Sequence, residues 1–350
     1  MEILVVSNMY PDKNNPSYGT FVRNFCGQLK ELEIDYDLVV MTKTNSKIKK
    51  LKKYIEFYTV CFFKIMFRKY DLIYVHYASH SSLGVLLASK FKKIRIFTNV
   101  HGSDVFPENK KQQNMQKYTK KILSKSDRIV VPSDYFKEIV INKYNICENK
   151  IFVSPSGGVD TRIFFDTNKV KTNSIFTIGY VGRLSYKKGW DVLVKACSLF
   201  DFKYKLIIVG DGPEKEKLSE YIEKNNLQDF VELRGLLSQK ELCEVYNKMN
   251  VFVFPTQRDG ESLGLVSVEA MACGTPVIAS DYAAPARYII DGYNGFKFAP
   301  GNVSDLANKI KMFKLLDTKE LDYLIMGAKE TAKKYSKEAA LRSMDEILRG

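Results

Sequence analysis

Two glutamates, Glu261 and Glu269, combine a residue type and a spacing that could bind an extended polar ligand. Glu261 follows a buried apolar run over 251–254, and Glu269 lies inside a predicted helix over 263–273. At 1.5 Å per residue, the two carboxylates are separated by about 12 Å along the helix. Carboxylates accept hydrogen bonds from vicinal hydroxyls, and the free N–H groups of a helix N-terminus attract phosphate. The pair therefore fits a sugar nucleotide, with two solvated glutamates on an amphipathic helix as the alternative.

The stretch around this pair resembles the signature of the retaining glycosyltransferases of family 4, which have the GT-B fold. That signature is Glu-x7-Glu with a triplet, usually Phe-Gly-Leu, after the first Glu; here Leu-Gly-Leu occupies 263–265. A second element over 179–189 contains the Gly-Arg-Leu and Lys-Gly strings that the family carries after a strand. The resemblance covers most of the chain and is more specific in the C-terminal half.

The resemblance implies a role for each matching residue. Arg183 and Lys188 would hold the donor pyrophosphate, Glu261 would orient the sugar hydroxyls during catalysis, and Glu269 would bind the ribose. The helix start between the two glutamates would complete the donor site, with Ser262, Leu263, Gly264 and Leu265. The donor would be a UDP- or GDP-linked sugar, and no further cofactor is expected. The loop over 281–287 departs from the family pattern, so the resemblance does not indicate which donor is preferred.

Two residues of the N-terminal half are also candidates. His101 follows a predicted buried strand, and the family often carries a His-Gly element there near the sugar and acceptor, so His101 is predicted to be catalytic. Gly19 matches a glycine that abuts the donor phosphate in the family, and a turn glycine is the alternative. His76 and His80 are assigned structural roles.

Short apolar strands alternate with helical segments along the chain, which predicts α/β architecture with doubly wound parallel sheets. The fold class expected is two Rossmann-like domains facing each other across a cleft, as in GT-B enzymes. The predicted parts are an acceptor-binding domain over 1–155, a linker over 156–174 and a nucleotide-sugar domain over 175–335. A C-terminal helix over 336–350 is expected to pack back on the N-terminal domain.

The chain carries a formal net charge of +14, and residues 43–69 hold nine cations against one acid, Glu56. A helix is predicted over 47–67. One apolar stripe, which includes Leu51 and Ile55, is expected to pack on the sheet. A second face mixes apolar and cationic side chains, which suits an anionic membrane; burial under another helix or a dimer contact are the alternatives. The predicted membrane face comprises Lys53, Phe57, Phe63, Lys64, Phe67 and Arg68.

Other patterns narrow the function. No Gly-x-Gly-x-x-Gly follows the first strand, which argues against an NAD enzyme, and the Asp35-Tyr36-Asp37 string is interpreted as chance. No metal site, nucleic-acid partner, secretory signal or membrane-spanning helix is expected. The six scattered cysteines indicate reduced thiols, so the protein is placed in the cytoplasm. The predicted membrane face places it peripherally at the inner face of the membrane.

The sequence therefore predicts a retaining glycosyltransferase that moves a sugar from a nucleotide-diphosphate donor to an acceptor hydroxyl of a lipid-linked or polysaccharide glycan precursor. A sugar-nucleotide epimerase of the same fold and a non-catalytic basic membrane-binding protein are the alternatives.

Overall fold

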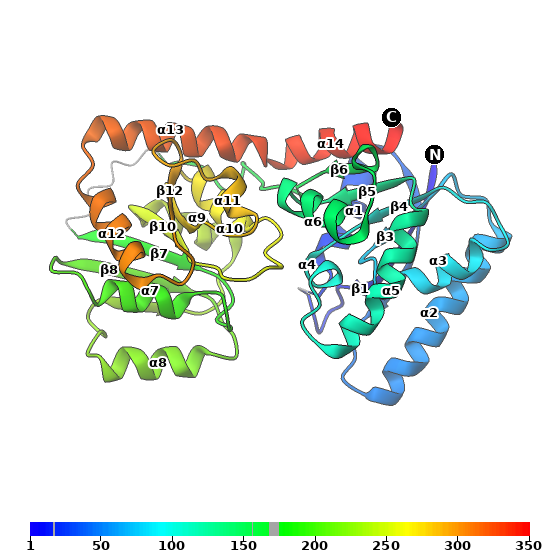
Figure 1. Cartoon of the computed structure of the whole chain (residues 1–350), viewed down its shortest axis with the longest axis horizontal. Helices are drawn as coiled ribbons and strands as arrows, with labels where there is room; N and C mark the ends of the chain where they lie inside the picture. Colours follow the sequence, from blue (N-terminus) through cyan, green and yellow to red (C-terminus); the bar gives the residue numbers. More distant parts are fainter. Residues whose placement is uncertain (17, 156, 168–174) are drawn as a thin grey trace. The chain divides into compact units, whose positions relative to one another are not determined.

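The computed structural model describes residues 1–16, 18–155, 157–167 and 175–350, which divide into two compact units. The first unit comprises Met1–Gly157 and Ala340–Gly350, and the second comprises Gly158–Ala339. Each contains a six-stranded parallel sheet with helices on both faces (Figure 1). The prediction of two Rossmann-like doubly wound α/β domains is confirmed. Of the predicted linker, 156 and 168–174 lie outside the described residues, while 158–167 belong to the second unit.

The first sheet has the strand order β2-β1-β3-β4-β5-β6, and every neighbouring pair is parallel. Chain order reverses at β1, so β1 and β3 flank a topological switch point, where open α/β sheets bind ligands. The strands are β1 (Glu2–Tyr10), β2 (Asp35–Thr42), β3 (Leu72–His76), β4 (Ile96–Asn99), β5 (Arg128–Val131) and β6 (Ile151–Val153).

Alternation along β1 divides the core of the first unit between the two faces of its sheet. Leu4 and Val6 point to one face, and Ile3 and Val5 point to the other. The first face is covered by α2 (Lys47–Phe67), α3 (Ser82–Ala88), α5 (Lys110–Lys125) and α6 (Asp134–Tyr144). The second face is covered by α1 (Thr20–Glu31) and by α14 (Lys337–Arg349). The short helices are α4 (Gly102–Val105) and the 3-10 turn η1 (Glu148–Lys150).

Helix α14 supplies part of this second core. Met344, Ile347 and Leu348 are almost fully buried and pack with β1, β3 and α1. The hydroxyl of Tyr74 on β3 lies 3.9 Å from Sδ of Met344. The C-terminal helix therefore completes the core of the N-terminal unit.

The second sheet has the order β12-β11-β10-β7-β8-β9 and is also parallel throughout. Its chain order reverses between β7 and β10, which form the switch point of this unit. The strands are β7 (Phe176–Val181), β8 (Tyr204–Val209), β9 (Val231–Arg234), β10 (Val251–Phe254), β11 (Val277–Ser280) and β12 (Gly295–Phe298).

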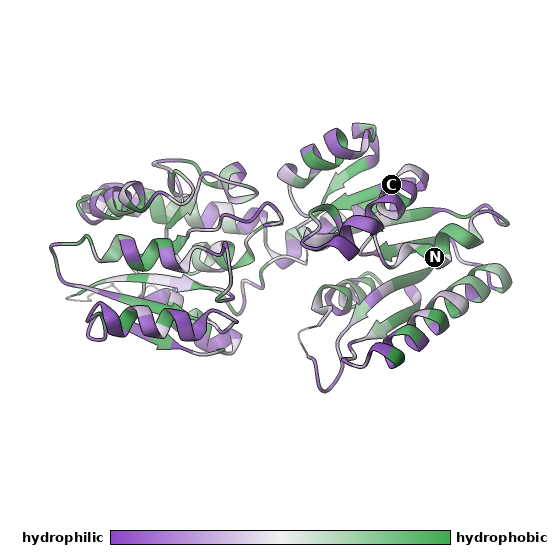
Figure 2. Ribbon diagram, turned by 60° about the horizontal axis from the view of Figure 1, so that its bottom comes forward, coloured by the Kyte–Doolittle hydropathy of each residue, from purple (hydrophilic) through white to green (hydrophobic). Residues whose placement is uncertain are grey.

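Helices cover both faces of the second sheet as well. One face is covered by α7 (Trp190–Cys197), α8 (Lys215–Lys224) and α12 (Val303–Lys314). The other is covered by α9 (Gln239–Lys248), α10 (Leu265–Ala272), α11 (Pro285–Tyr288) and α13 (Thr318–Lys334). Figure 2 shows largely apolar strands in both units, with helices banded in polar and apolar residues as expected for amphipathic elements.

Helix α10 begins two residues later than its predicted start. Gly264 adopts a left-handed conformation, with φ of 77°, and stands as the N-cap before Leu265. A Cβ on Gly264 would lie 2.8 Å from a ring carbon of Phe254, so a larger residue would clash there as well as strain the backbone. Glu261 therefore lies in the loop before the helix, while Glu269 lies within it.

The predicted packing of α2 is wrong in part. Phe57, expected on the membrane face, is 4% exposed and packs in the core with Cys61 and Ile65. Leu51 and Ile55, expected against the sheet, are 64% and 60% exposed. The reason is that α2 packs against α3 as well as the sheet, so residues spaced by four from Phe57 form its inward face.

The cations predicted on the same face have partners within the unit. Lys64 and Arg68 form salt bridges with Asp37 at 3.1 and 2.8 Å. Lys53 donates to the backbone carbonyl and the hydroxyl of Thr42. Phe63 and Phe67 are exposed, and their rings stack 5.8 Å apart.

Candidate active site

Two loops at the switch point of the second sheet carry most of the predicted site residues. The loop over 182–189 follows β7, and the loop over 255–264 follows β10. Because β7 and β10 are neighbouring parallel strands, both loops leave the same edge of the sheet. Residues about 75 positions apart along the chain are thereby placed together.

Lys188 and Glu261 meet between these loops. Nζ of Lys188 lies 2.6 Å from Oε2 of Glu261, and both side chains are mostly buried. The hydroxyl of Thr256 donates to the same oxygen at 3.1 Å. The ring of Phe254 lies 5.7 Å from the ammonium. The carboxylate is therefore fixed by two donors, and its other oxygen, to which no described residue donates a hydrogen bond, can accept from a ligand hydroxyl.

Glu269 lies within α10, where a residue of the neighbouring helix α9 contacts its carboxylate. Its Oε2 accepts a hydrogen bond from the hydroxyl of Tyr246 on α9 at 3.0 Å. Burial raises the pKa of Glu269 to about 7, and the Tyr246 hydrogen bond opposes that rise only partly. The charge of this carboxylate therefore changes near neutral pH.

The remaining donor-site candidates lie around these two glutamates. Arg183 is exposed, and its guanidinium forms no hydrogen bond or salt bridge with the part of the chain that the structure describes. Leu263 is buried, and its carbonyl accepts from the hydroxyl of Tyr288 at 3.0 Å. Ser262 is half-buried, and Leu265 is the first residue of α10, where the leading N–H groups have no partner within the helix.

His101 lies in the first unit, just beyond the carboxyl end of β4. Its backbone N–H donates to Oδ1 of Asp104 at 2.8 Å, while Oδ2 of Asp104 accepts from the N–H of Ala78 at 2.8 Å. The ring of Phe21 packs 4.0 Å from the imidazole. Burial lowers the pKa of His101 to about 3, so the ring is neutral at physiological pH.

A second imidazole supports His101. Nδ1 of His76, at the end of β3, lies 3.3 Å from Nε2 of His101. His76 is buried, and burial lowers its pKa well below the usual value, so both rings are neutral and one of them donates its N–H to the other. The structural role assigned to His76 therefore includes orienting His101.

Gly19 forms the N-cap of α1 with φ of 75°. A Cβ at this position would lie 2.6 Å from the backbone carbon of Met9, which cannot move aside. Backbone geometry is therefore a sufficient reason for glycine here. Its predicted contact with the donor phosphate stays a prediction.

Comparison with known proteins identifies the family. The model for glycosyltransferase family 4 matches residues 18–162, and the model for glycosyl transferases group 1 matches residues 160–331. An uncharacterized glycosyltransferase of Methanocaldococcus jannaschii is 32% identical over 282 residues, covering 79% of this chain and 74% of that protein. The chain belongs to the GT-B glycosyltransferases.

Other proteins similar to this glycosyltransferase support the same assignment. The capsular polysaccharide biosynthesis glycosyltransferase CapM of Staphylococcus aureus is 29% identical over 63% of this chain and 60% of its own length. The crystal structure of Anabaena HepE in complex with UDP superposes with a TM-score of 0.79 over 99% of both chains, at 19% identity. The latter likeness establishes the fold.

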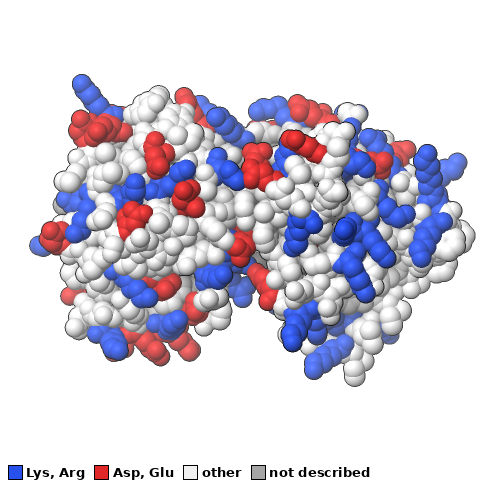
Figure 3. Space-filling model, in the orientation of Figure 1, with Lys and Arg blue, Asp and Glu red and all other residues white. Residues whose placement is uncertain are grey.

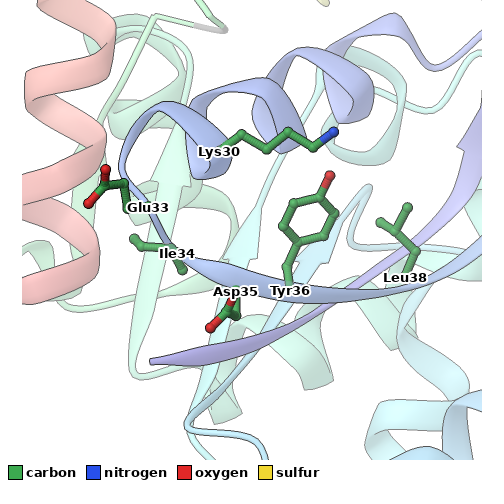
Figure 4. A pocket seen from close by; sticks show the side chains of 6 residues that line it. All are labelled: Lys30, Glu33, Ile34, Asp35, Tyr36 and Leu38. Carbon is green, nitrogen blue, oxygen red and sulfur yellow. The ribbon is translucent and has the colours of Figure 1, made fainter.

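The Asp-x-Asp string of the glycosyltransferase lies at the edge strand of the first sheet. Asp37 accepts from Lys64, Arg68 and the hydroxyl of Tyr70. Asp35 lines an open pocket of 640 Å³ at the start of β2 together with Lys30 and Tyr36, and Figure 4 shows the Tyr36 ring pointing toward Lys30. The two carboxylates therefore lie in different environments, because Asp37 is held by hydrogen bonds within the protein and Asp35 borders the pocket. Within the described ranges, no group of three or more His, Cys, Asp or Glu side chains could hold a metal ion.

Sequence reasoning did not identify three residues that form hydrogen bonds with the candidate residues. Thr256 and Tyr246 belong to no motif, and Asp104 gave no signal beyond following a His-Gly pair. Thr256 and Asp104 contact Glu261 and His101 within the same loop or turn, but no motif marks these contacts, and Tyr246 reaches its partner from another helix. No described helix is long and apolar enough to span a bilayer.

Proposed function

We propose that this glycosyltransferase transfers a sugar from a nucleoside-diphosphate donor to an acceptor hydroxyl with retention of configuration. The acceptor oxygen attacks the anomeric carbon on the face from which the diphosphate departs. The bond between that carbon and the diphosphate oxygen breaks, and the acceptor proton passes to the leaving phosphate. Holding the two reactants in line at one face of the sugar is the main task left to the protein.

The observation that supports this proposal best is the Lys188–Glu261 pair, with Arg183 on the same loop as Lys188 and its guanidinium free of any described partner. The Arg183 guanidinium has five N–H donors, and the Lys188 ammonium has two more besides the one directed at Glu261; such donors stabilise charge on a leaving diphosphate. One oxygen of Glu261 accepts from the sugar hydroxyls, and Glu269 accepts from the ribose diol. UDP in the Anabaena relative favours a uridine donor, and GDP is the second candidate.

His101 is proposed to contact the sugar or the acceptor as a neutral imidazole. Its low pKa excludes a cationic role at physiological pH. Its hydrogen bond to His76 and the packing of the Phe21 ring fix the imidazole plane. A fixed, neutral ring favours a hydrogen bond to the sugar or the acceptor over general acid catalysis.

The test combines donor binding and product stereochemistry. Intact-protein mass spectrometry with a panel of UDP- and GDP-sugars identifies the donor, and proton NMR of the product gives the anomeric configuration. We expect the anomeric coupling of the product to match that of the donor. An inverted product would contradict the retaining mechanism while leaving glycosyl transfer intact.

The acceptor is proposed to be a lipid-linked or polysaccharide glycan precursor, since CapM acts in capsular polysaccharide biosynthesis. We also propose that the enzyme works in the cytoplasm at the inner face of an anionic membrane. The outward stripe of α2, here Leu51, Ile55, Phe63 and Phe67, is exposed and flanked by exposed lysines at the start of the helix.

Vesicle sedimentation tests the membrane proposal. Wild-type protein should sediment with vesicles that contain phosphatidylglycerol and detach as salt rises, because surface attraction is screened. Replacing Phe63 and Phe67 by Ser should remove the salt-resistant part of binding. Sedimentation that is unchanged in this double variant would show that the stripe does not insert.

A further inference from the structure

A groove of 620 Å³ lies between α2, α3 and α5 of the first unit. Its floor is apolar, with Leu83, Leu86 and Leu87 of α3 between the rings of Tyr58 and Tyr118. This volume falls within the range of roughly 300–1,000 Å³ that is usual for small-molecule sites. The groove shares no lining residue with the hollow around His76 and His101.

Two hydroxyl groups of the lining are already committed within the protein. The Tyr58 hydroxyl donates to the carbonyl of His80 at 2.9 Å. The Ser124 hydroxyl donates to the carbonyl of Lys121 at 2.9 Å. A peptide laid in the groove would therefore find few partners for its backbone, whereas a hydrocarbon chain needs none.

The rim of the groove is cationic. Lys90, Lys121 and Lys125 line it, and none of the three forms a salt bridge with a described residue. The sequence of α5 contains six lysines and no acid. Figure 3 shows Lys and Arg side chains prevailing over this part of the first unit. An apolar floor with a rim of one sign is complementary to a chain that ends in an anionic group.

Apolar surface continues from the groove to α2. Leu87 is 47% exposed and Phe91 is 67% exposed. The Phe91 ring lies 6.1 Å from that of Phe62, whose neighbour Phe63 belongs to the outward stripe. An apolar surface of this extent on one face of a unit is typical of an interaction site.

We propose that the groove binds one anionic membrane lipid, with a hydrocarbon chain along the floor and the phosphate held by the three lysines. A second copy of the chain is disfavoured as occupant because the same cationic rim would face itself. The inference rests on the membrane association proposed above and does not depend on the glycosyl-transfer chemistry.

An introduced indole reports on the groove directly. The full-length protein carrying Leu83→Trp is mixed with vesicles of phosphatidylglycerol whose acyl chains are brominated, and with matched phosphatidylcholine vesicles. The native Trp190 is 2% exposed in the second unit and serves as an unquenched reference. We expect the introduced indole to be quenched by phosphatidylglycerol and not by phosphatidylcholine.

Charge-reversed variants distinguish binding of the lipid by the rim lysines from general attraction of a cationic protein to an anionic vesicle. Lys90→Glu, Lys121→Glu and Lys125→Glu together should lower vesicle partitioning about 100-fold or more. The matched control, Lys203→Glu, Lys224→Glu and Lys240→Glu, makes the same charge change on exposed lysines of the second unit and should lower it far less.

Leu87→Glu should abolish quenching at position 83. Its matched control is Leu199→Glu, because Leu199 is 50% exposed in the second unit. Circular dichroism and calorimetric donor binding confirm that each variant is folded.

Three results would overturn the proposal. The first is quenching of a Phe63→Trp reporter on the outward stripe without quenching at position 83, which would mean adsorption to the surface alone. The second is equal partitioning of the two triple variants. The third is a concentration-dependent dimer in sedimentation velocity that Leu87→Glu dissociates, with no quenching at position 83, which would assign the groove to a second copy.

Discussion

Nζ of Lys188 and Oε2 of Glu261 lie 2.6 Å apart, although 73 residues separate them along the chain. The resemblance assigned one to the pyrophosphate and the other to the sugar. Their contact makes them one unit, because each neutralises the other where neither is well solvated. Substitution of either residue therefore leaves a largely buried charge without its partner.

Lys188→Ala should lower both stability and donor affinity. Breaking a mostly buried pair costs about 3 kcal/mol of unfolding free energy, and losing a charge-assisted contact to the diphosphate costs about 1.5–3 kcal/mol of binding. Urea denaturation and calorimetry with UDP measure the two effects. The double variant Lys188→Ala, Glu261→Ala should recover part of the stability but none of the affinity. Recovery of neither would mean that the pair is not coupled.

Arg183→Ala should weaken donor binding with little effect on stability, because the guanidinium is exposed and has no described partner to leave behind. We expect a loss of about 10- to 100-fold in UDP affinity. Lys187→Ala is the control, since Lys187 is an exposed cation of the same loop. Equal losses in both variants would indicate a general charge effect.

The pH dependence of donor binding should follow Glu269. Because burial raises its pKa to about 7, the carboxylate is charged mainly above that pH, and the ribose hydroxyls pair better with the charged form. UDP affinity should therefore rise as pH increases from about 6 to about 8. Glu269→Gln should flatten this dependence, while Glu244→Gln on the exposed side of α9 should leave it unchanged.

The free energy of unfolding, unlike the affinity for UDP, should fall as pH rises. The folded pKa of Glu269 lies above the unfolded value of about 4.3. The folded protein therefore binds the proton more tightly, and this contribution to stability is lost as pH rises toward 7. A steeper loss of unfolding free energy in Glu269→Gln than in wild type over this range would contradict the assignment.

Sugar transfer should continue in EDTA. The diphosphate charge is assigned to Arg183, Lys188 and the start of α10, which require no metal ion. Turnover measured before and after chelation checks this. Loss of activity that Mg²⁺ or Mn²⁺ restores would contradict it, and Asp35→Asn would then show whether that carboxylate is involved.

The sequence predicted the fold well where burial alone decides. The strand Val251–Phe254 is a continuous apolar run, as a parallel strand buried on both faces requires, and its observed bounds match the predicted ones. Its neighbour Phe176–Val181 is buried along almost all of its length. The loops that follow them carry motif residues, so their meeting at one sheet edge followed from the doubly wound topology.

The sequence could not predict contacts that depend on a third element. Phe57 and Ile55 are equally apolar, and only the packing of α3 against α2 decides that the former is buried. Likewise, Tyr246 reaches Glu269 from another helix, and His76 reaches His101 from another strand. The spacing of residues along the chain does not show which side chains become neighbours in the folded protein.

The packing of α14 in the first unit has a consequence for biosynthesis. The whole of Gly158–Ala339 must be synthesised after β6 and before the part of α14 that packs with Ile3, Val5 and Phe97. At 5–20 residues per second, ribosomes need roughly 10–40 s for that stretch. Throughout that interval this apolar face of the nascent N-terminal sheet is covered by α1 but lacks α14, while the continuous second unit can fold as it emerges. Chaperone dependence should therefore concentrate on the first unit.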